Sequence, residues 1–213
     1  MKNIVLFAIM TLITGILSGQ PVQDIKLNAP DMERGLTIMK AFENRASATS
    51  FSSRELSLQD LSDLLWASNG INRPESGKRT APTAVNAQDI DIYVLLRSGA
   101  YLYDHKTHTL KGIAAGDNRT LVSDSQTAFA DAPVMIVLVS DISRFTVGDD
   151  ARKLSWGAMD AGIVSQNVAL FCAGAGLVTR PRASMDFEGL KKLLQLNSTR
   201  HLMLNNPVGY PNE

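Results

Sequence analysis

A continuous apolar run at residues 134–139, Val-Met-Ile-Val-Leu-Val, constrains the fold more than any other segment. A strand with one face in water alternates apolar and polar residues, whereas a strand that is buried on both faces is apolar throughout. We therefore expect residues 134–139 to form a strand inside a sheet. Residues 90–96 alternate and are rich in Ile, Tyr and Val, which is typical of a strand, and residues 101–103 are expected to pair with residues 109–111 as a hairpin.

Helical spacing of apolar residues marks several segments around these strands. Residues 32–42 carry apolar side chains at helical intervals, which predicts a helix that ends at Arg45. Ser57 is the expected N-cap of a second helix, which closes at Asn69 and Gly70. The other expected elements are a mobile polar connection at residues 71–78, an amphipathic helix at residues 187–196 and a last strand at residues 201–204, before Pro207 and Gly209.

A long helix is expected over residues 151–175, where small residues are mixed with large apolar ones. Such a helix is apolar on nearly all sides, so we expect other parts of the protein to enclose it. Its small residues permit close approach of another backbone, which fits either the middle of a core or a helix shared across a dimer interface. Cys172, the only cysteine, lies in this segment, and we interpret it as a small buried apolar residue rather than a nucleophile.

Chain length and charge limit the number of domains and the kind of partner. At 213 residues the chain is long enough for one domain with a substantial core, or for one domain plus an arm. Lys and Arg together number 21, as do Asp and Glu, so no net charge draws the protein to nucleic acid or to an anionic membrane. We expect a small molecule or another protein as the partner, and no nucleic acid.

The N-terminus resembles a cleaved secretory signal. Lys2 precedes an apolar run that extends from Ile4 to Leu17 and ends in the small residues Ser18 and Gly19. This run is short for a bilayer span, although an uncleaved membrane-tethering helix is the alternative. We therefore expect an exported, periplasmic protein without membrane contact once the signal is removed. The expected division is a signal peptide at residues 1–19, an N-terminal arm at residues 20–30 and one folded domain at residues 31–213.

Two polar segments carry the residue types expected of a binding site. Pro82 favours a turn, and Thr83 can cap the turn that follows. Ala84 keeps the surface low enough for a planar ligand, and Asn86 offers both a donor and an acceptor. By itself this segment is also typical of a surface turn that caps a helix. Its combination with an upstream segment, residues 44–51, which holds an arginine and several hydroxyl groups, favours a binding site.

Two further patterns have ordinary explanations. Residues 173–179 contain a pair of glycines, but a helix runs into them and a strand follows, which is the reverse of a dinucleotide-binding fingerprint. We interpret this segment as a helix C-terminus whose glycines free backbone groups to face a ligand. His105 and His108 have a spacing that occurs in metal sites, but no carboxylate or cysteine cluster accompanies them, so we expect an exposed hairpin tip and no metal.

The order and spacing of these segments resemble the nitroreductase family of flavin-dependent oxidoreductases. The resemblance is carried by residues 45–51 (RASATSF), 82–88 (PTAVNAQ), 175–177 (AGL) and 207–211 (PVGYP). Residues 58–71 look most like the branch related to azoline-forming (SagB-type) dehydrogenases. The resemblance covers about residues 31–211. It implies an α+β fold with a central, mostly antiparallel sheet wrapped by helices, and an intertwined homodimer with one FMN at each of two interface sites.

The resemblance also implies roles for individual residues. Arg45 and Ser47 would hold the FMN phosphate, and an arginine fork and a hydroxyl are suitable donors for it. Asn86 would bind the polar edge of the flavin ring, and a backbone amide in residues 175–177 would lie near its reactive nitrogen. The expected FMN-binding residues are Arg45, Ala46, Ser47, Thr49, Pro82, Thr83, Ala84, Asn86, Ala175, Gly176 and Leu177; no side chain is expected to act as a general acid or base.

At the phosphate end the sequence departs from the family's pattern. Thr49 stands where the family usually has a cation, Ala46 replaces a frequent second arginine, and the chain ends at Glu213 without the basic residues that often follow. If no other cation reaches the phosphate, we expect FMN to bind weakly. The expected substitutes are Arg180 and Arg182 at the phosphate, and Lys78 or Arg79 near the carbonyl edge of the ring.

Together these features predict an exported FMN-dependent oxidoreductase with ping-pong electron transfer. NAD(P)H or another donor, such as a protein, reduces the flavin and leaves, and an electron-poor acceptor such as a nitroaromatic or a quinone then takes the electrons. The alternative is a flavin-binding module or sensor with little or no turnover, which Ala46, Thr49 and the short C-terminus favour. A periplasmic solute-binding protein fits less well, because its two lobes would need more chain.

Overall fold

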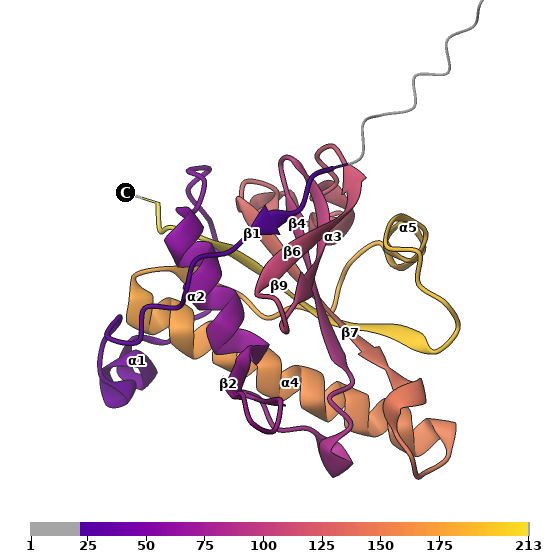
Figure 1. Ribbon diagram of the computed structural model, residues 1–213. Helices are drawn as coiled ribbons and strands as arrows, with labels where there is room; N and C mark the ends of the chain where they lie inside the picture. The colour runs from indigo at the N-terminus through magenta and orange to yellow at the C-terminus, as the bar shows by residue number, and fades with distance from the viewer. Residues whose placement is uncertain (1–21, 213) are drawn as a thin grey trace, which may run out of the picture.

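The structure, a computed structural model, describes residues 22–212. The predicted signal peptide lies outside the described residues. A seven-stranded sheet in the order β1-β6-β5-β4-β7-β9-β8 forms the centre of the molecule, and all neighbouring strands in it are antiparallel (Figure 1). The strands are β1 (Ile25–Lys26), β4 (Ile90–Leu96), β5 (Gly99–Asp104), β6 (Thr109–Ala115), β7 (Val134–Asp141), β8 (Val178–Thr179) and β9 (Arg200–Gly209).

The strands expected from the sequence are confirmed. β7 contains the apolar run, lies between β4 and β9, and is buried along its whole length. β4 has the predicted bounds. The predicted hairpin forms between β5 and β6, with Leu102 opposite Lys111 and Tyr103 opposite Leu110. Part of the expected N-terminal arm supplies β1 at the edge of the sheet.

Helices cover both faces of the sheet (Figure 1). On one face α2 and α4 pack over residues that include Ile136 and Leu138 of β7. On the other face α3 and α5 pack over their neighbours Met135 and Val137. Successive residues of one strand point to opposite faces, so a strand with a core on each side must be apolar throughout. The helices are α1 (Ile38–Asn44), α2 (Leu58–Asn69), α3 (Thr120–Ser123), α4 (Asp150–Ala175) and α5 (Phe187–Leu193).

α1 is shorter than the helix predicted for residues 32–42. It ends directly before Arg45, as expected, but it begins only after Leu36. Gly35 has a φ of 100°, and the Leu36 amide donates to the Gly174 carbonyl at 3.0 Å. This bond ties the preceding residues to the end of α4, so they do not form a helical turn of their own.

α2 begins and ends where the sequence predicts. The Ser57 hydroxyl accepts from the Asp60 amide at 3.0 Å, and Gly70 follows the last helical residue. The prediction of a mobile connection after this helix is wrong. Two short strands, β2 (Ile71–Arg73) and β3 (Lys78–Arg79), pair there as a small antiparallel hairpin.

Two elements near the C-terminus differ in length from the prediction. α5 ends at Leu193, and Gln195 just beyond it has a φ of 53°, a left-handed conformation that does not continue a helix. β9 is longer than predicted and runs through Pro207, which lies opposite Met135 of β7. The Pro207 carbonyl accepts from the Thr179 hydroxyl at 2.7 Å, which anchors β8 beside it.

α4 is not enclosed on all sides, so that prediction is wrong for the single chain. Its inner face is buried at residues such as Val164, whereas Met159 and Ile163 on the outer face are 62% and 36% exposed. A Cβ added at Gly162 would meet no atom within 4 Å, so this face is open. Cys172 is buried, as expected, and burial raises the pKa of its thiol.

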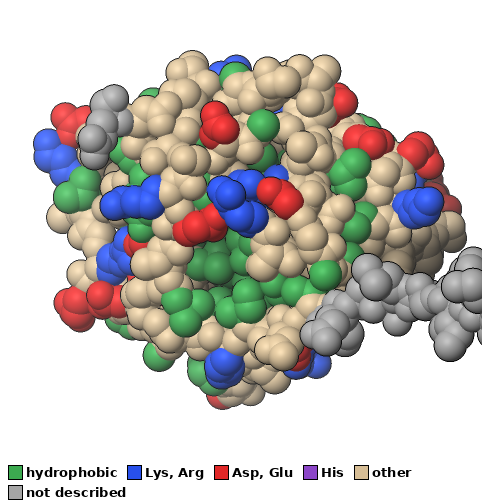
Figure 2. Space-filling model, turned by 90° about the horizontal axis from the view of Figure 1, so that it is seen from above, with side chains coloured by type: hydrophobic (Ala, Val, Ile, Leu, Met, Phe, Trp, Pro, Cys, Tyr) green, Lys and Arg blue, Asp and Glu red, His purple; other side chains and the backbone are tan. Residues whose placement is uncertain are grey.

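Residues 22–212 contain no helix that combines the length and the apolar character needed to cross a bilayer. On the face that Figure 2 shows, Lys and Arg side chains are interspersed with Asp and Glu around an apolar hollow. Neither sign of charge dominates this face, in agreement with the formal net charge of zero.

Candidate functional site

The first and third predicted segments meet at the C-terminal end of α4. Ser47 forms an isolated parallel bridge with Thr179, and the Ala48 amide donates to the Thr179 carbonyl at 2.9 Å. A cavity of about 90 Å³ between the segments is lined by residues of both. We call residues 45–49 together with residues 175–177 the cap cluster.

Each segment reaches this place because a helix ends there. α1 closes at Asn44, and Arg45 after it is extended, with a ψ of 115°. α4 closes at Gly176, whose φ of 74° is a left-handed conformation that glycine adopts without strain. The two helix ends turn the chain so that its next residues run side by side.

The polar side chains of the cap cluster are free to receive a ligand. Arg45, Ser47 and Thr49 are exposed, and none of their side chains forms a hydrogen bond or an ion pair with another described residue. Nη1 of Arg180 lies 3.5 Å from the Ala48 carbonyl oxygen, which places a second cation next to this segment. An arginine fork, a hydroxyl and a neighbouring cation are the donors that a phosphate binds, so these residues fit the FMN phosphate.

The backbone amides at the end of α4 are already engaged. The Gly176 amide and the Leu177 amide both donate to the Cys172 carbonyl, the second at 2.9 Å. The resemblance implies that an amide in residues 175–177 lies near the reactive nitrogen of a flavin. A flavin that accepts from either of these two amides would have to share the N–H with the Cys172 carbonyl or displace that bond. The contact between a backbone amide and the flavin therefore stays a prediction.

The middle segment forms a strained turn before β4. Ala84–Asn86 form a short 3₁₀ helix, η1, and Val85, Asn86 and Gln88 all have φ angles between 48° and 56°. Non-glycine residues rarely adopt this left-handed conformation, and it is least favourable for a β-branched residue such as Val85. We call Pro82, Thr83, Ala84 and Asn86 the turn cluster.

Two contacts hold this turn in place. The Thr83 hydroxyl accepts from the Gln88 amide at 2.8 Å, and the Asp160 carboxyl of α4 accepts from the Ala84 amide at 2.9 Å. The Asn86 side chain is exposed and forms no hydrogen bond with another described residue. Its amide is therefore available to both a donor and an acceptor of a ligand.

Asp160 contacts a second carboxyl group, that of Asp89. Asp89 is fully buried and accepts from the Ser140 hydroxyl, and Asp160 is 3% exposed. Burial and the contact with Asp89 raise the pKa of Asp160 to about 7, although the bond from the Ala84 amide acts in the opposite direction. We did not expect this pair from the sequence. A lone carboxylate within an otherwise small and apolar part of α4 was the available signal.

One chain does not bring the turn cluster to the cap cluster. The turn is attached to α4 at Asp160, whereas the cap cluster lies at Ala175, about 22 Å further along the helix at a rise of 1.5 Å per residue. Figure 1 shows the same separation, with α1 at one end of α4 and the small coil before β4 well back along the helix. The eleven predicted residues therefore form two groups rather than one site.

Two of the four cations expected to support the site are used inside the fold. Arg182 is 7% exposed and donates to the carbonyls of Val122 and Ser123. Arg79 is 6% exposed and donates to the Ile90 carbonyl at 3.1 Å. Both guanidinium groups are buried and donate to backbone carbonyls instead of to water. Neither is therefore available to a phosphate or a flavin ring.

Arg54 is a cation near the cap cluster that we did not expect from the sequence. Its guanidinium carbon lies 3.5 Å from the centroid of the Tyr210 ring, and the two residues line a cavity of about 320 Å³ together with Gly176. Tyr210 is held in turn by its hydroxyl, which donates to Asp60 of α2. Arg54 thus supplies positive charge beside the end of α4.

The two histidines do not form an exposed hairpin tip. Both are half-buried: Nε2 of His105 lies 3.0 Å from Nη2 of Arg79, and Nδ1 of His108 lies 2.8 Å from the Tyr103 hydroxyl. Burial and the charge of Arg79 lower the pKa of His105 to about 4. Within residues 22–212 no three His, Cys, Asp or Glu side chains gather where they could hold a metal ion.

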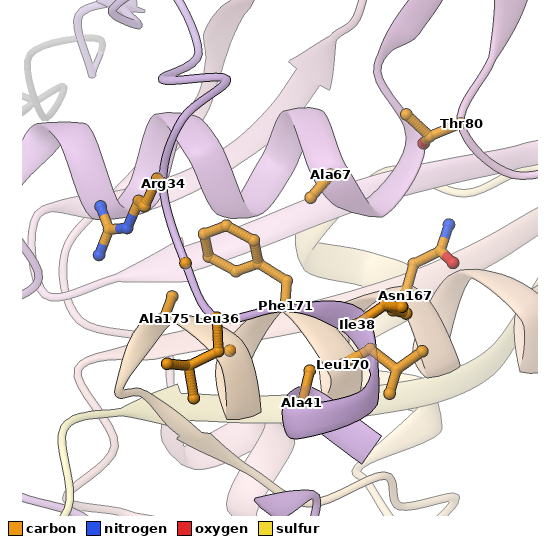
Figure 3. A pocket seen from close by; sticks show the side chains of 12 residues that line it. Arg34, Leu36, Ile38, Ala41, Ala67, Thr80, Asn167, Leu170, Phe171 and Ala175 are labelled. Atoms are coloured by element: carbon orange, nitrogen blue, oxygen red, sulfur yellow. The ribbon is translucent and has the colours of Figure 1, made fainter. Parts of the chain in front are cut away.

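An apolar groove of about 320 Å³ lies between the two clusters (Figure 3). Ala67 of α2 and Phe171 of α4 form its walls, and Ile38 of α1 lies across from them. Thr80, at one end, leads into the turn cluster, and Ala175, at the other end, belongs to the cap cluster. The groove therefore joins the two groups of predicted residues along α4.

Comparisons with known proteins identify the family. Residues 42–210 match the model of the nitroreductase family. A protein of Methanocaldococcus jannaschii that is named as a nitroreductase is 26% identical over 194 residues, which cover 87% of this chain and 96% of that protein. A crystal structure from Ralstonia eutropha JMP134, likewise named as a nitroreductase, is 32% identical with a TM-score of 0.81 and covers 92% of each chain.

A similar fold occurs in the Escherichia coli microcin synthetase McbBCD, solved with truncated pro-MccB17 bound. One of its chains has a TM-score of 0.71 at 18% identity, covering 99% of this chain and 85% of that chain. At this identity the likeness shows the fold alone. The family model extends over most of the sequence, and the relative from Ralstonia is similar over nearly its whole length. This chain belongs to the nitroreductase family.

Proposed function

We propose that this chain is an FMN-dependent oxidoreductase that works as a homodimer. NAD(P)H or another donor delivers electrons and leaves, and an electron-poor acceptor such as a nitroaromatic or a quinone then occupies the same site and takes them. Membership of the nitroreductase family supports the oxidoreductase class. The cofactor, the donor, the acceptor and the dimer belong to the proposal.

The observation that carries this proposal is the cap cluster. Arg45 and Ser47, to which the family resemblance assigns the FMN phosphate, lie exposed and unpaired within the described chain beside the end of α4. Arg180 and Arg54 lie close to the same helix end. This arrangement offers a phosphate several donors without requiring any of the described salt bridges to break.

When bound, FMN supplies the redox chemistry, and the residues of this chain bind and orient it. Arg45 and Ser47 hold the phosphate through charge-assisted hydrogen bonds. Asn86 matches a donor and an acceptor at the polar edge of the ring. The apolar walls of the groove at Phe171 exclude water from the ligand. We assign no side chain as a general acid or base.

Two copies of the chain are needed to complete such a site, because the two clusters lie about 22 Å apart along α4. In a two-fold dimer whose axis lies perpendicular to α4 the two helices run antiparallel, so the turn cluster of one copy approaches the cap cluster of the other. The single chain leaves apolar side chains exposed on the surfaces that such a dimer would cover. They are Ile38, Met39 and Phe42 of α1, Met159 and Ile163 of α4, and Val85 of the turn.

We also propose that the protein is exported, from the resemblance of residues 1–19 to a secretory signal. NAD(P)H is a cytoplasmic donor. An exported enzyme would therefore take electrons from a protein or another donor present in its own compartment.

The visible spectrum of the purified mature protein, with and without added FMN, tests this function. We expect flavin absorption to elute with the protein at the volume of a dimer, and the reduced protein to reoxidise faster when a quinone is added. Protein that binds no flavin at saturating FMN would contradict the proposal.

A flavin-binding module with little turnover is the second candidate. Thr49 carries no charge, and Arg182, one of the expected substitutes, is committed to carbonyl groups inside the fold. The phosphate end therefore has fewer cations than the family's pattern. Bound flavin that reoxidises no faster with a quinone than without it would favour this second candidate.

A further inference from the structure

Two buried carboxyl groups lie directly beneath the turn cluster. Asp89, just before β4, is 0% exposed, and Asp160 of α4 is 3% exposed. Oδ2 of Asp89 accepts from the Ser140 hydroxyl of β7, whereas its Oδ1 is buried and has no hydrogen-bond partner among the described residues. Both oxygens of Asp160 face the Ala84 amide, at 2.9 and 3.1 Å.

Among residues 22–212 no cation forms an ion pair with either carboxyl group. Arg79 of β3 lies near enough to Asp89 to sense its charge, but its guanidinium is hydrogen-bonded elsewhere, in part to His105. Arg144, in the short helix η3 (Ile142–Arg144), is paired with Asp91. Two adjacent buried carboxylates that lack an ion pair with any cation are strongly unfavourable, so one of them must hold a proton.

We propose that Asp89 and Asp160 share one proton, and that this protonated pair is a positioning device that holds the turn cluster in the shape that receives the flavin ring. Only the flavin part of this inference rests on the proposed function. The shared proton is a property of the protein without ligand.

The turn needs such an anchor because its backbone is strained. Val85, Asn86 and Gln88 are left-handed, and these conformations persist only where the surroundings impose them. With the proton in place, Asp160 accepts from the Ala84 amide and remains in contact with Asp89. When the proton leaves, two negative charges face each other. The bond from the Ala84 amide favours the charged form of Asp160, but repulsion from Asp89 drives the two carboxyl groups apart and moves the turn that is attached to Asp160.

The contact also makes stability depend on pH. The pKa of Asp160 is raised from 3.8 to about 7 by burial and by Asp89. Because the folded pKa lies above the unfolded one, the stabilisation is complete below about pH 4 and is lost as the pH rises to about 7.

The first test compares the unfolding constants of the wild-type protein and of Asp160→Asn, both without flavin, from pH 4 to pH 9. The asparagine keeps an oxygen for the Ala84 amide and offers Asp89 a permanent N–H in place of the proton. The ratio of the wild-type to the variant unfolding constant should rise by up to tenfold per pH unit between about pH 4 and pH 7, and then become constant. Parallel curves over the whole range would overturn the shared proton.

The second test measures the FMN dissociation constant at pH 7 and pH 9, where the FMN phosphate is largely dianionic. Wild-type affinity should fall by about tenfold or more over this range, whereas that of Asp160→Asn should stay within about twofold. Asp160→Leu, which keeps the branched shape of the side chain but has no acceptor for Ala84, should bind weakly at both pH values and shift the visible spectrum of the bound flavin. Arg45→Ala should weaken binding without that spectral shift.

The outcomes separate the two proposals. If wild type and Asp160→Asn show the same pH dependence of FMN affinity, the positioning role is wrong. If none of the proteins binds FMN, the proposed function is wrong, and the unfolding constants still decide whether the two carboxyl groups share a proton.

Discussion

The cap cluster and the turn cluster would bind the same ligand, but they differ in how their backbones are held. In the cap cluster the polar side chains of Arg45 and Ser47 are exposed, and the backbone is held by ordinary pairing with Thr179. Its one left-handed residue is Gly176, which adopts that conformation without strain. The turn that carries the turn cluster has three left-handed non-glycine residues, Val85, Asn86 and Gln88, and the buried carboxyl of Asp160 holds it through the Ala84 amide.

Because of this difference, the two regions should contribute to ligand binding in different ways. The cap cluster can contribute binding energy directly, because its donors are not already paired within the described chain. The turn cluster can contribute shape, because its backbone conformation depends on groups buried beneath it. A change in the first region should alter affinity more than stability, and a change beneath the second should alter both.

The largest effect should come from separating the two regions. Ile163→Glu places a charge on the exposed apolar face of α4, where a second copy would have to bury it. We expect a monomer whose FMN affinity is about a hundredfold or more below that of the wild type, because neither copy then receives the other's turn cluster. Analytical ultracentrifugation and FMN titration measure the two quantities.

Val147→Glu is the matched control for this change. Val147 is 52% exposed but lies in the loop before α4 rather than on the helix itself. It should leave both the assembly and the affinity unchanged. A monomeric Ile163→Glu protein with wild-type affinity would show that one chain holds the flavin alone.

A smaller loss is expected when the phosphate grip is removed. Arg45→Ala should weaken FMN binding by about tenfold to a hundredfold, since a hydrogen bond to a charged group contributes about 1.5–3 kcal/mol. Arg180→Ala should weaken it less, because Arg180 also lies against the Ala48 carbonyl and the Phe129 ring. Equal losses in FMN titrations of the two variants would mean that the phosphate grip is misassigned, and the midpoint of urea unfolding should be unchanged for Arg45→Ala.

Backbone changes should have still smaller effects and should differ in sign between the regions. Gly176→Ala should lower the free energy of unfolding by about 1 kcal/mol, because alanine is strained at a φ of 74°. No atom lies within 4 Å of the added Cβ, so a steric clash does not contribute. Urea unfolding checks the value, and an unchanged stability would show that the end of α4 adjusts its backbone freely.

The smallest expected effect is a gain at the turn. In the monomeric Ile163→Glu protein, where no second copy covers Val85, Val85→Asn should raise the free energy of unfolding by about 0.5 kcal/mol, because asparagine tolerates the left-handed region better than a β-branched residue. Val147→Asn is the control, since Val147 is equally a surface valine but is not left-handed. If both variants change stability by the same amount, the strain at Val85 is not stored in the folded state.

Much of the fold followed from local pattern. The strand at residues 134–139, the hairpin after β4 and the bounds of α2 were predicted, because burial on two faces, alternation and helix caps leave direct traces in the sequence. The predictions failed where a distant partner decides the conformation. The start of α1 is set by the bond from Leu36 to Gly174, and the predicted mobile segment after α2 is a paired hairpin.

The candidate site was likewise predictable only in part. The residue types at Arg45, Ser47 and Asn86 could be chosen from the sequence, since their donors and acceptors suit a phosphate or a polar ring edge. Their grouping could not, because it depends on where each segment meets α4. Arg182 and Arg79 show the limit most clearly: an arginine in a sequence does not indicate whether its guanidinium faces water or a buried carbonyl.

By itself, the sequence determined the α+β class, the central buried strand and the family, because these rest on residue patterns that are local or ordered along the chain. Only the tertiary structure decided that the predicted site residues form two groups, and that Asp89 and Asp160 meet beneath one of them. The physical reason is that burial, charge pairing and backbone strain depend on neighbours in space, and residues distant in sequence supply those neighbours.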